Sequence, residues 1–292
     1  MTAQFDVEDV IYQTGDGGQL HARLYKPWAN PSKGSYLNPA VVSVHGGRWC
    51  DDSRLTNEVI DRHLASNGIF VMAIDFRMPP QVKFPHPVSD INYAIRWLKK
   101  YAQELCIDAK KIGGIGTSSG GHQLLLNALQ PKGDLYASQP LGSDNDLDAS
   151  LAYAIACWPV SDPLERYRYV LEKKMQLHIE CHHAYWKDDL EMGKGSPQRI
   201  LDENDMSHLP PLLLIQGTDD TVLAPGMTKK FAASYEAAGG KVILCEFKGQ
   251  PHTFITKFPS HEDSDRAMKN ISTFASACGE VGADLIFETG PS

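Results

Sequence analysis

Several features that mark specialised classes of protein are missing from this sequence. It has no stretch of roughly 18 apolar residues, the length needed to cross a bilayer, and no dense run of lysine or arginine. The formal net charge is -8, from 36 acidic and 28 basic side chains. We therefore expect neither nucleic acid nor a membrane as a partner.

The cysteines also exclude familiar arrangements, because all six lie far apart and form no CxxC pair: Cys50, Cys106, Cys157, Cys181, Cys245 and Cys278. Such spacing fits neither a disulfide framework nor a zinc-binding motif. The opening residues, MTAQFDVEDV, are acidic where a secretory signal needs a positive segment and an apolar run. We expect a cytoplasmic protein with reduced thiols, no metal and no other cofactor.

What the sequence does contain is a regular alternation of strand-like and helix-like segments. Residues 7–14 and 19–27 predict an antiparallel pair around the turn GDGG. Further buried strands are predicted from apolar, β-branched runs at 39–45, 69–76, 110–116, 151–160, 210–217 and 241–247. Apolar strands separated by helical patterns predict a mostly parallel sheet with helices on both faces. We expect one α/β domain over residues 1–292.

The helical patterns fall between these strands. One runs over residues 87–105 and repeats apolar side chains on a single face: Ile91, Ala94, Ile95, Leu98 and Tyr101. Residues from about 162 to 207 are rich in charge and aromatics and are too long for a simple crossover. They predict a helical cap over the carboxyl edge of the sheet. The last 14 residues, GEVGADLIFETGPS, show no period of either kind.

A glycine-rich turn, GTSSGG, follows the strand predicted at 110–116. Ser118 has glycine two positions before and two positions after it, in the pattern G-x-S-x-G, whereas Ser119 does not. A nucleophile elbow holds its serine in a strained conformation between strand and helix, and side chains at the two flanking positions would collide with neighbouring backbone. The turn therefore predicts Ser118 as a nucleophile.

Ser119 opens the helix after this turn, so its backbone N–H faces the space above Ser118. We expect that amide to act as an oxyanion donor and the Ser119 hydroxyl to be dispensable. The alternatives for the turn are plain packing or a phosphate site. It lacks, however, both the G-x-G-x-x-G pattern of dinucleotide-binding folds and the lysine of a P-loop.

A serine nucleophile needs a base, and the base must be held by a carboxylate. Asp219 and Asp220 follow the strand predicted at 210–217, and His252 follows the next strand. These loops lie at strand carboxyl ends, where open α/β sheets bind ligands. Turn and helix-cap chemistry could also explain the aspartates, and the histidine could be an ordinary loop residue.

Two glycines, Gly46 and Gly47, follow the strand predicted at 39–45. They would let a backbone amide face Ser118 without a side chain between, and a tetrahedral intermediate needs two or more such N–H groups. The alternative is a tight turn that requires positive φ. We interpret His45 as a brace for this loop, and His122 as a structural residue that faces away from the elbow.

A histidine-rich segment lies within the predicted cap and resembles a set of metal ligands: His178, Cys181, His182 and His183. Two of the histidines have helical i, i+4 spacing. The glutamate of an HExxH motif is missing, however, so we expect these residues on the surface of the cap.

Taken in order, the segments HGGRW, GTSSGG, GTDDTVLAP and PHTF resemble the signature blocks of the α/β-hydrolase superfamily. The resemblance is closest to its hormone-sensitive-lipase-like esterases and the neighbouring feruloyl/acetyl-esterase-like group, and it runs from about residue 5 to 278. It implies an α/β-hydrolase fold and a carboxylesterase with Ser118 as nucleophile and His252 as base. The family's G-T-x-D block implies Asp220 as the acid. The oxyanion hole implied is made of the amides of Gly46, Gly47 and Ser119.

The sequence departs from the lipase-type H-G-G-G loop, because Arg48 and Trp49 follow the two glycines. H-G-G-x-W is similar to the loop of arylformamidases, which cleave N-formylkynurenine, so an aryl formamide is an alternative to an ester. We expect Trp49 and Trp158 to bind an aromatic or apolar part of a small-molecule ester or amide substrate, and plain core packing is the alternative for such large aromatics. A non-hydrolytic binding protein or lyase of the same fold is a further alternative. The oligomeric state stays open, a homo-oligomer included.

Overall fold

The computed structural model describes residues 5–15, 18–28, 37–142 and 147–277. In these ranges a single eight-stranded sheet has the order β1-β2-β4-β3-β5-β6-β7-β8. The pairs β1–β2 and β2–β4 are antiparallel, and all later pairs are parallel. This confirms the predicted α/β class and the opening antiparallel pair. The strands are β1 (Phe5–Gly15), β2 (Gly18–Pro27), β3 (Asn38–Val44), β4 (Phe70–Ile74), β5 (Ile107–Thr117), β6 (Ala154–Cys157), β7 (Leu212–Gly217) and β8 (Val242–Phe247).

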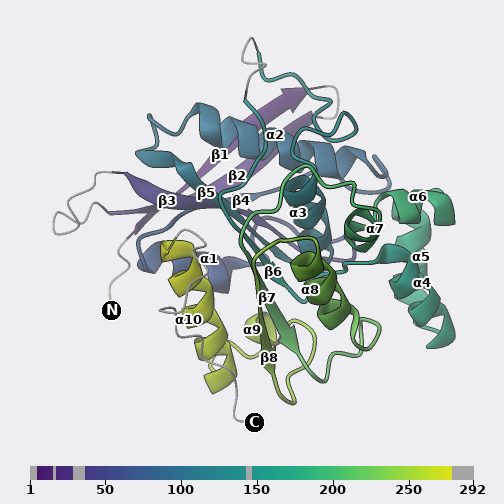
Figure 1. Cartoon of the computed structure of the whole chain (residues 1–292). Coiled ribbons are helices and arrows are strands. Elements are labelled where there is room, and N and C mark those ends of the chain that lie inside the picture. Colours follow the sequence, from purple (N-terminus) through teal and green to yellow (C-terminus); the bar gives the residue numbers. More distant parts are fainter. Residues whose placement is uncertain (1–4, 16–17, 29–36, 143–146, 278–292) are drawn as a thin grey trace.

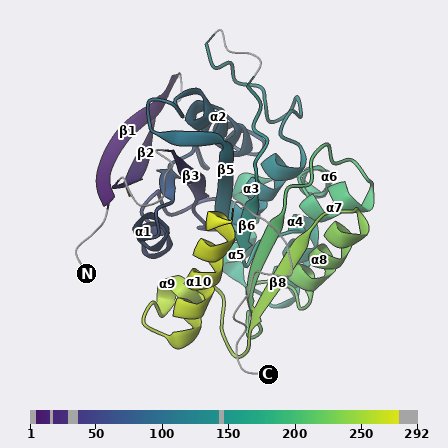
Figure 2. The ribbon, with the colours of Figure 1, turned by 60° about the vertical axis from the view of Figure 1, so that its left-hand side comes forward.

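Helices cover both faces of the sheet (Figures 1 and 2). α1 and α10 pack together on one face, whereas α2 and α3 pack together on the other. No helix of the described residues has the length and apolarity that crossing a membrane requires. The helices are α1 (Glu58–Ser66), α2 (His86–Lys100), α3 (Ser119–Leu129), α4 (Pro163–Glu172), α5 (Gln176–Tyr185), α6 (Asp189–Lys194), α7 (Pro197–Asp202), α8 (Met227–Ala237), α9 (Phe254–Lys257) and α10 (Glu262–Ser276).

The apolar patterns of the sequence correspond to buried surface. β4 and β7 are buried along their whole length, as expected of parallel strands covered on both faces. On α2, the predicted apolar face is buried between residues 91 and 98, and Tyr101 follows the helix as its half-buried C-cap. β6 is shorter than the predicted strand at 151–160, because Trp158 has a φ of 41° and leaves the extended conformation.

Four helices, α4 to α7, lie between β6 and β7 in the segment for which the sequence predicts a cap. Polar side chains begin three of them: Asp162 accepts backbone N–H groups at the start of α4, Asp188 at the start of α6, and Ser196 at the start of α7. The single-domain organisation over 1–292 stays a prediction, because the tail at 279–292 and the tip of the first turn lie outside the described residues.

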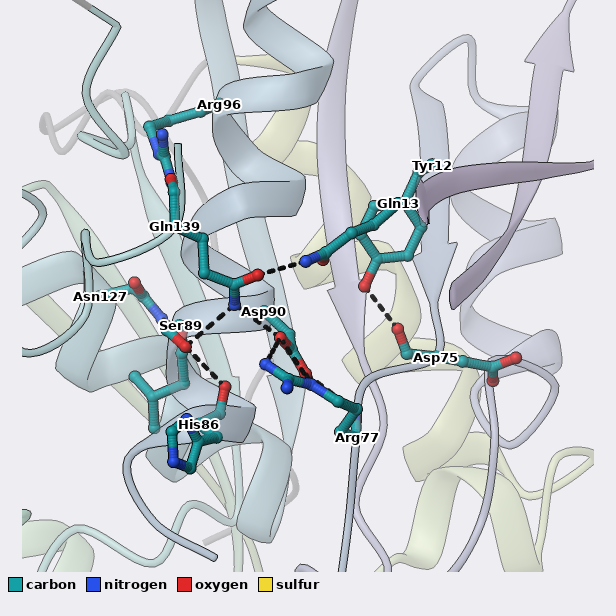
Figure 3. Close-up of polar contacts among 11 residues, drawn as sticks. Tyr12, Gln13, Asp75, Arg77, His86, Ser89, Asp90, Arg96, Asn127 and Gln139 are labelled. Atoms are coloured by element: carbon teal, nitrogen blue, oxygen red, sulfur yellow. Dashed lines mark hydrogen bonds and ion pairs between the residues drawn. The ribbon is translucent and has the colours of Figure 1, made fainter. Parts of the chain in front are cut away.

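A polar network joins β1, the chain after β4, α2 and the loop that follows α3 (Figure 3). Its centre is Asp90, which is fully buried and accepts hydrogen bonds from the Arg77 guanidinium at 2.6 Å and from the Gln139 amide at 2.7 Å. Gln139 also bonds Gln13 on β1, and Tyr12 donates to the carbonyl of Asp75 at 2.6 Å. The network fixes the first strand against α2.

Candidate active site

The turn between β5 and α3 holds Ser118 in the conformation expected of a nucleophile elbow. Its φ is 51° and its ψ is -119°, a strained backbone that costs on the order of 1–3 kcal/mol. Close backbone contacts explain the flanking glycines. A Cβ on Gly116 would lie 2.7 Å from the carbonyl oxygen of Gly120, and a Cβ on Gly120 would lie 2.1 Å from that of His45.

A chain of hydrogen bonds leads from Ser118 through His252 to Asp220. The serine Oγ lies 2.9 Å from Nε2 of the histidine, and Nδ1 of the same ring lies 2.7 Å from Oδ2 of the aspartate. An ionised carboxylate only accepts, so Nδ1 carries the proton and Nε2 is free to accept from the hydroxyl. Ser118 and His252 are each less than a tenth exposed. The structure thus brings together three residues from three separate loops.

Asp220 is held by more than the histidine. Its Oδ1 accepts the backbone N–H of Val222 at 2.8 Å, and its Oδ2 also accepts the side-chain amide of Gln216 at 3.0 Å. Burial by itself raises the pKa of Asp220, but the hydrogen bond and charge of His252, with the other donors, bring that pKa below its ordinary value. Asp219 is exposed, and its carboxylate accepts from the Thr218 hydroxyl instead.

The segment 46–49, here named the oxyanion loop after the role that the sequence predicts for it, lies directly against Ser118. A Cβ on Gly46 would be 3.2 Å from Cβ of Ser118. Gly47 has a φ of 92°, and a Cβ at this position would lie 2.0 Å from the carbonyl oxygen of Asp51. Ser119 is the first residue of α3, so its N–H has no partner within the helix. Gly46 and Gly47 line the same cavity as Ser118.

The sequence-based expectation for Trp49 requires correction. Its side chain is completely buried and is not part of the cavity wall, so it cannot touch a substrate there. The ring stacks on Tyr185 with centroids 5.3 Å apart, and it also contacts Trp186 and His182. Trp49 therefore packs α5 against α3. Trp158, in contrast, does line the cavity, with its ring edge-on to His252.

The cavity above Ser118 has a volume of about 370 Å³. The oxyanion loop, the elbow, Trp158 and α9 form its walls, and its polar groups include Arg48, Asp52 and Lys257. A larger cavity of about 520 Å³ lies beside Arg96, but it contains none of the hydrogen-bonded chain. The smaller cavity is therefore the candidate site, because the reactive geometry is there.

The cap contributes His178, which the sequence analysis expected on the surface. The ring lines the cavity, and burial together with the charges of Arg166 and Arg48 lowers the pKa of His178 to about 4. His182, four residues later, is fully buried and accepts a hydrogen bond from Arg166 at 2.8 Å. The i, i+4 spacing of His178 and His182 thus marks the face of α5 that is turned toward the interior, and not an exposed face.

A further correction concerns this segment. Cys181 is buried as well, so only His183 of the four residues is exposed, and it bonds the Tyr167 hydroxyl at 2.7 Å. Arg166 is also buried, with its guanidinium 5.6 Å from the centre of the Trp49 ring. Across the described ranges, no group of three or more His, Cys, Asp and Glu side chains is arranged to hold a metal ion.

The two histidines interpreted as structural are both buried. Nδ1 of His45 lies 3.0 Å from the carbonyl oxygen of Gly46, and the ring stacks on Phe76. His122 lies in the first turn of α3, where it bonds Trp49 and the carbonyl of Gly195. Neither histidine lines the cavity.

Comparisons with known proteins agree with this geometry. The BD-FAE family model matches residues 28–235. The chain is 28% identical to esterase LipC of Mycobacterium tuberculosis (strain ATCC 25618 / H37Rv), over 81% of this chain and 58% of LipC. It is 27% identical to ethyl acetate hydrolase of Pseudomonas putida, over 90% of this chain and 80% of that protein. It thus spans less than two thirds of LipC.

A solved structure supports the fold. The hyperthermophilic esterase of the archaeon Pyrobaculum calidifontis superimposes with a TM-score of 0.75 at 24% identity, over 93% of this chain and 83% of that one. At this level of identity the likeness concerns the fold. The fold of this chain is thus the fold of that esterase.

Proposed function

The chain belongs to the BD-FAE family of α/β-hydrolases, and from that premise we propose that it is a carboxylesterase for small to medium-sized esters. The observation that carries the proposal is the hydrogen-bonded chain from Ser118 through His252 to Asp220 at the floor of a cavity. The family match and the esterase relatives support it.

In the first half-reaction, the Ser118 hydroxyl attacks the ester carbonyl while Nε2 of His252 takes its proton. Asp220 keeps the proton of the ring on Nδ1 and stabilises the imidazolium that forms. Collapse of the tetrahedral intermediate breaks the bond to the alcohol, which leaves with the proton held on Nε2. The acyl group is then bound to the serine as an ester.

In the second half-reaction, water attacks the acyl-enzyme, and His252 accepts a proton from it. As the second intermediate collapses, its bond to Ser118 breaks, His252 returns the proton to the serine oxygen, and the carboxylic acid is released. The negative oxygen of both intermediates is bound by the amides of Gly46, Gly47 and Ser119. Each such donor typically contributes about 2.7–4 kcal/mol to stabilisation of the transition state.

The cavity suggests the size of the substrate. At about 370 Å³ it lies near the lower end of the range for ligand pockets, which starts at about 300 Å³. Trp158 offers an apolar surface beside His252. We propose esters with short acyl chains, aromatic alcohols included. The cytoplasmic location, the lack of a cofactor and the oligomeric state stay predictions.

The HGGRW loop favours a second candidate, an arylformamidase that uses the same three residues. The two activities differ in the bond that is cleaved, and hydrolysis of N-formylkynurenine much faster than of simple esters would favour the formamide. A non-hydrolytic binding protein is less well supported, because a binder has no need of a base and an acid aligned on a buried serine.

Turnover tests the proposal directly. With p-nitrophenyl acetate and butyrate as substrates, the wild-type protein is expected to release p-nitrophenol. Ser118→Ala should lower kcat by several orders of magnitude without a change in the melting temperature, because a residue without a hydroxyl cannot form the acyl-enzyme. A wild-type protein with no turnover of any ester or formamide, or a fully active alanine variant, would refute the proposal.

A further inference from the structure

We propose that the hydroxyl of Ser119 is a positioning group that fastens the oxyanion loop to the nucleophile helix through Trp49, with His122 as a second fastening point. The proposal rests on the hydrolytic function above. It reverses the expectation that this hydroxyl is dispensable, and it gives Trp49 a role other than substrate contact.

The backbone conformation of the oxyanion loop has to be held by contacts from outside the loop. Three consecutive residues, Gly47, Arg48 and Trp49, have φ angles of 92°, 57° and 67°. Positive φ is unfavourable for side chains as large as arginine and tryptophan, and it persists only where surrounding contacts determine it. Directly after the loop, the backbone N–H groups of Cys50 and Asp51 donate to the carbonyl of Gly47, but these local bonds do not orient the loop toward Ser118.

Trp49 provides the missing connection with two hydrogen bonds. Its backbone N–H donates to Oγ of Ser119 at 3.0 Å, and its indole N–H donates to Nδ1 of His122 at 3.0 Å. Both acceptors lie in the first turn of α3, the helix that begins immediately after Ser118. All three residues are completely buried. The loop that carries Gly46 and Gly47 is therefore hydrogen-bonded to α3. Ser119, the first residue of α3, supplies the remaining amide of the proposed oxyanion hole.

The state of His122 suits this role. Its Nε2 donates to the carbonyl of Gly195 at 2.7 Å, so Nδ1 is left without a proton and can accept from the indole. Burial lowers the pKa of His122 to about 4. The ring therefore stays neutral, and an acceptor, over the pH range in which a histidine base can function.

Loss of the Ser119 hydroxyl would leave the N–H of Trp49 buried without a partner. The loop is then expected to relax, and the amides of Gly46 and Gly47 to move away from the place where negative charge develops. Those amides act on the transition state more than on the bound ester. The effect should therefore fall on kcat, whereas KM should change little.

The test compares Ser119→Ala with a matched control, Ser89→Ala. Ser89 is also buried in the first turn of a helix, and its hydroxyl accepts an N–H, from Gln139, at 3.0 Å (Figure 3). For p-nitrophenyl butyrate we expect Ser119→Ala to lower kcat by about 10–100-fold with KM within about twofold. Ser89→Ala should keep kcat within about twofold of the wild type, whatever it costs in stability.

Two readouts make the outcome decisive. A trifluoromethyl ketone, which forms an oxyanion on the serine, should bind Ser119→Ala more weakly by about the factor lost in kcat, and amide hydrogen exchange of residues 46–49 should be faster than in the wild type. Should Ser119→Ala fold poorly, Trp49→Phe keeps the backbone bond to Ser119 but loses the indole bond to His122 and part of the ring packing against Tyr185, and it should lower kcat by a smaller factor.

An unchanged kcat and unchanged exchange in Ser119→Ala would overturn the proposal, and so would an equal fall in kcat in Ser89→Ala or an effect confined to KM. The Ser118→Ala variant distinguishes failure of the positioning proposal from failure of the esterase proposal. If the wild type turns over and Ser118→Ala does not, the esterase proposal stands on its own, whatever Ser119→Ala does.

Discussion

At the scale of single residues, the choice between two adjacent carboxylates is the part of the site that the sequence left most open. Both Asp219 and Asp220 follow β7, and only the resemblance to a family block favoured the second. The structure separates them physically. Asp220 turns toward His252 and accepts four hydrogen bonds, while Asp219 stays exposed on the outer side of the loop.

The paired substitutions Asp220→Asn and Asp219→Asn test this assignment. Asp220→Asn should lower kcat by about 10³–10⁴-fold, because an amide can leave the ring of His252 in the wrong tautomer. Asp219→Asn should keep kcat within about twofold. The measurement is steady-state hydrolysis of p-nitrophenyl butyrate, and similar losses in the two variants would count against Asp220 as the acid.

A second residue-scale effect concerns stability. Asp61 on α1 is fully buried, and burial raises its pKa from 3.8 to about 8, with the Ser43 hydroxyl opposing the shift. Between pH 4 and 8 the folded chain holds a proton on Asp61 that the unfolded chain has released. The unfolded state therefore binds fewer protons, and stability should fall as pH rises through this range.

Asp61→Asn is expected to remove this penalty. The amide is neutral at every pH, so the variant should gain melting temperature at pH 8 and gain much less at pH 4.5. Thermal unfolding followed by circular dichroism at the two pH values measures the difference. An equal gain at both values, or a larger one at the lower pH, would show that Asp61 is not protonated in the folded chain.

At the scale of elements, the elbow depends on backbones that touch. Gly120→Ala would place a Cβ 2.1 Å from the carbonyl oxygen of His45, so β3 and α3 must separate. We expect a loss of about 3 kcal/mol in the free energy of unfolding. Gly15→Ala meets no atom within 4 Å and should change the free energy of unfolding by less than about 0.5 kcal/mol. Urea unfolding measures both, and an equally stable Gly120→Ala would mean that the elbow is looser than described.

The helices and strands differ in how well the sequence alone predicts them. The long amphipathic α2 and the buried strands β4 and β7 were predictable, because their own side chains repeat with the period of the element. The helices between β6 and β7 were not resolved individually, since all four have ten residues or fewer and their order depends on distant partners. Arg166 on α4, for example, is fixed by His182 and Trp49.

At the scale of the whole molecule, the residues that line the site come from widely separated segments. Ser118, Asp220 and His252 could be predicted, because each follows a strand and parallel strands end at one edge of the sheet. His178 could not, because it reaches the cavity only when the cap folds over the sheet. The network around Asp90 was hidden for the same reason, since it joins β1 to a loop more than a hundred residues away (Figure 3).

The central claim is that the Ser118 hydroxyl, activated by His252, forms a covalent acyl-enzyme. A fluorophosphonate reacts much faster with an activated serine than with other side chains, so mass spectrometry of the labelled and digested protein tests the claim most directly. The account predicts one adduct, on the peptide that contains Ser118, and none in Ser118→Ala. An adduct on another serine, or an active enzyme that takes up no label, would contradict it.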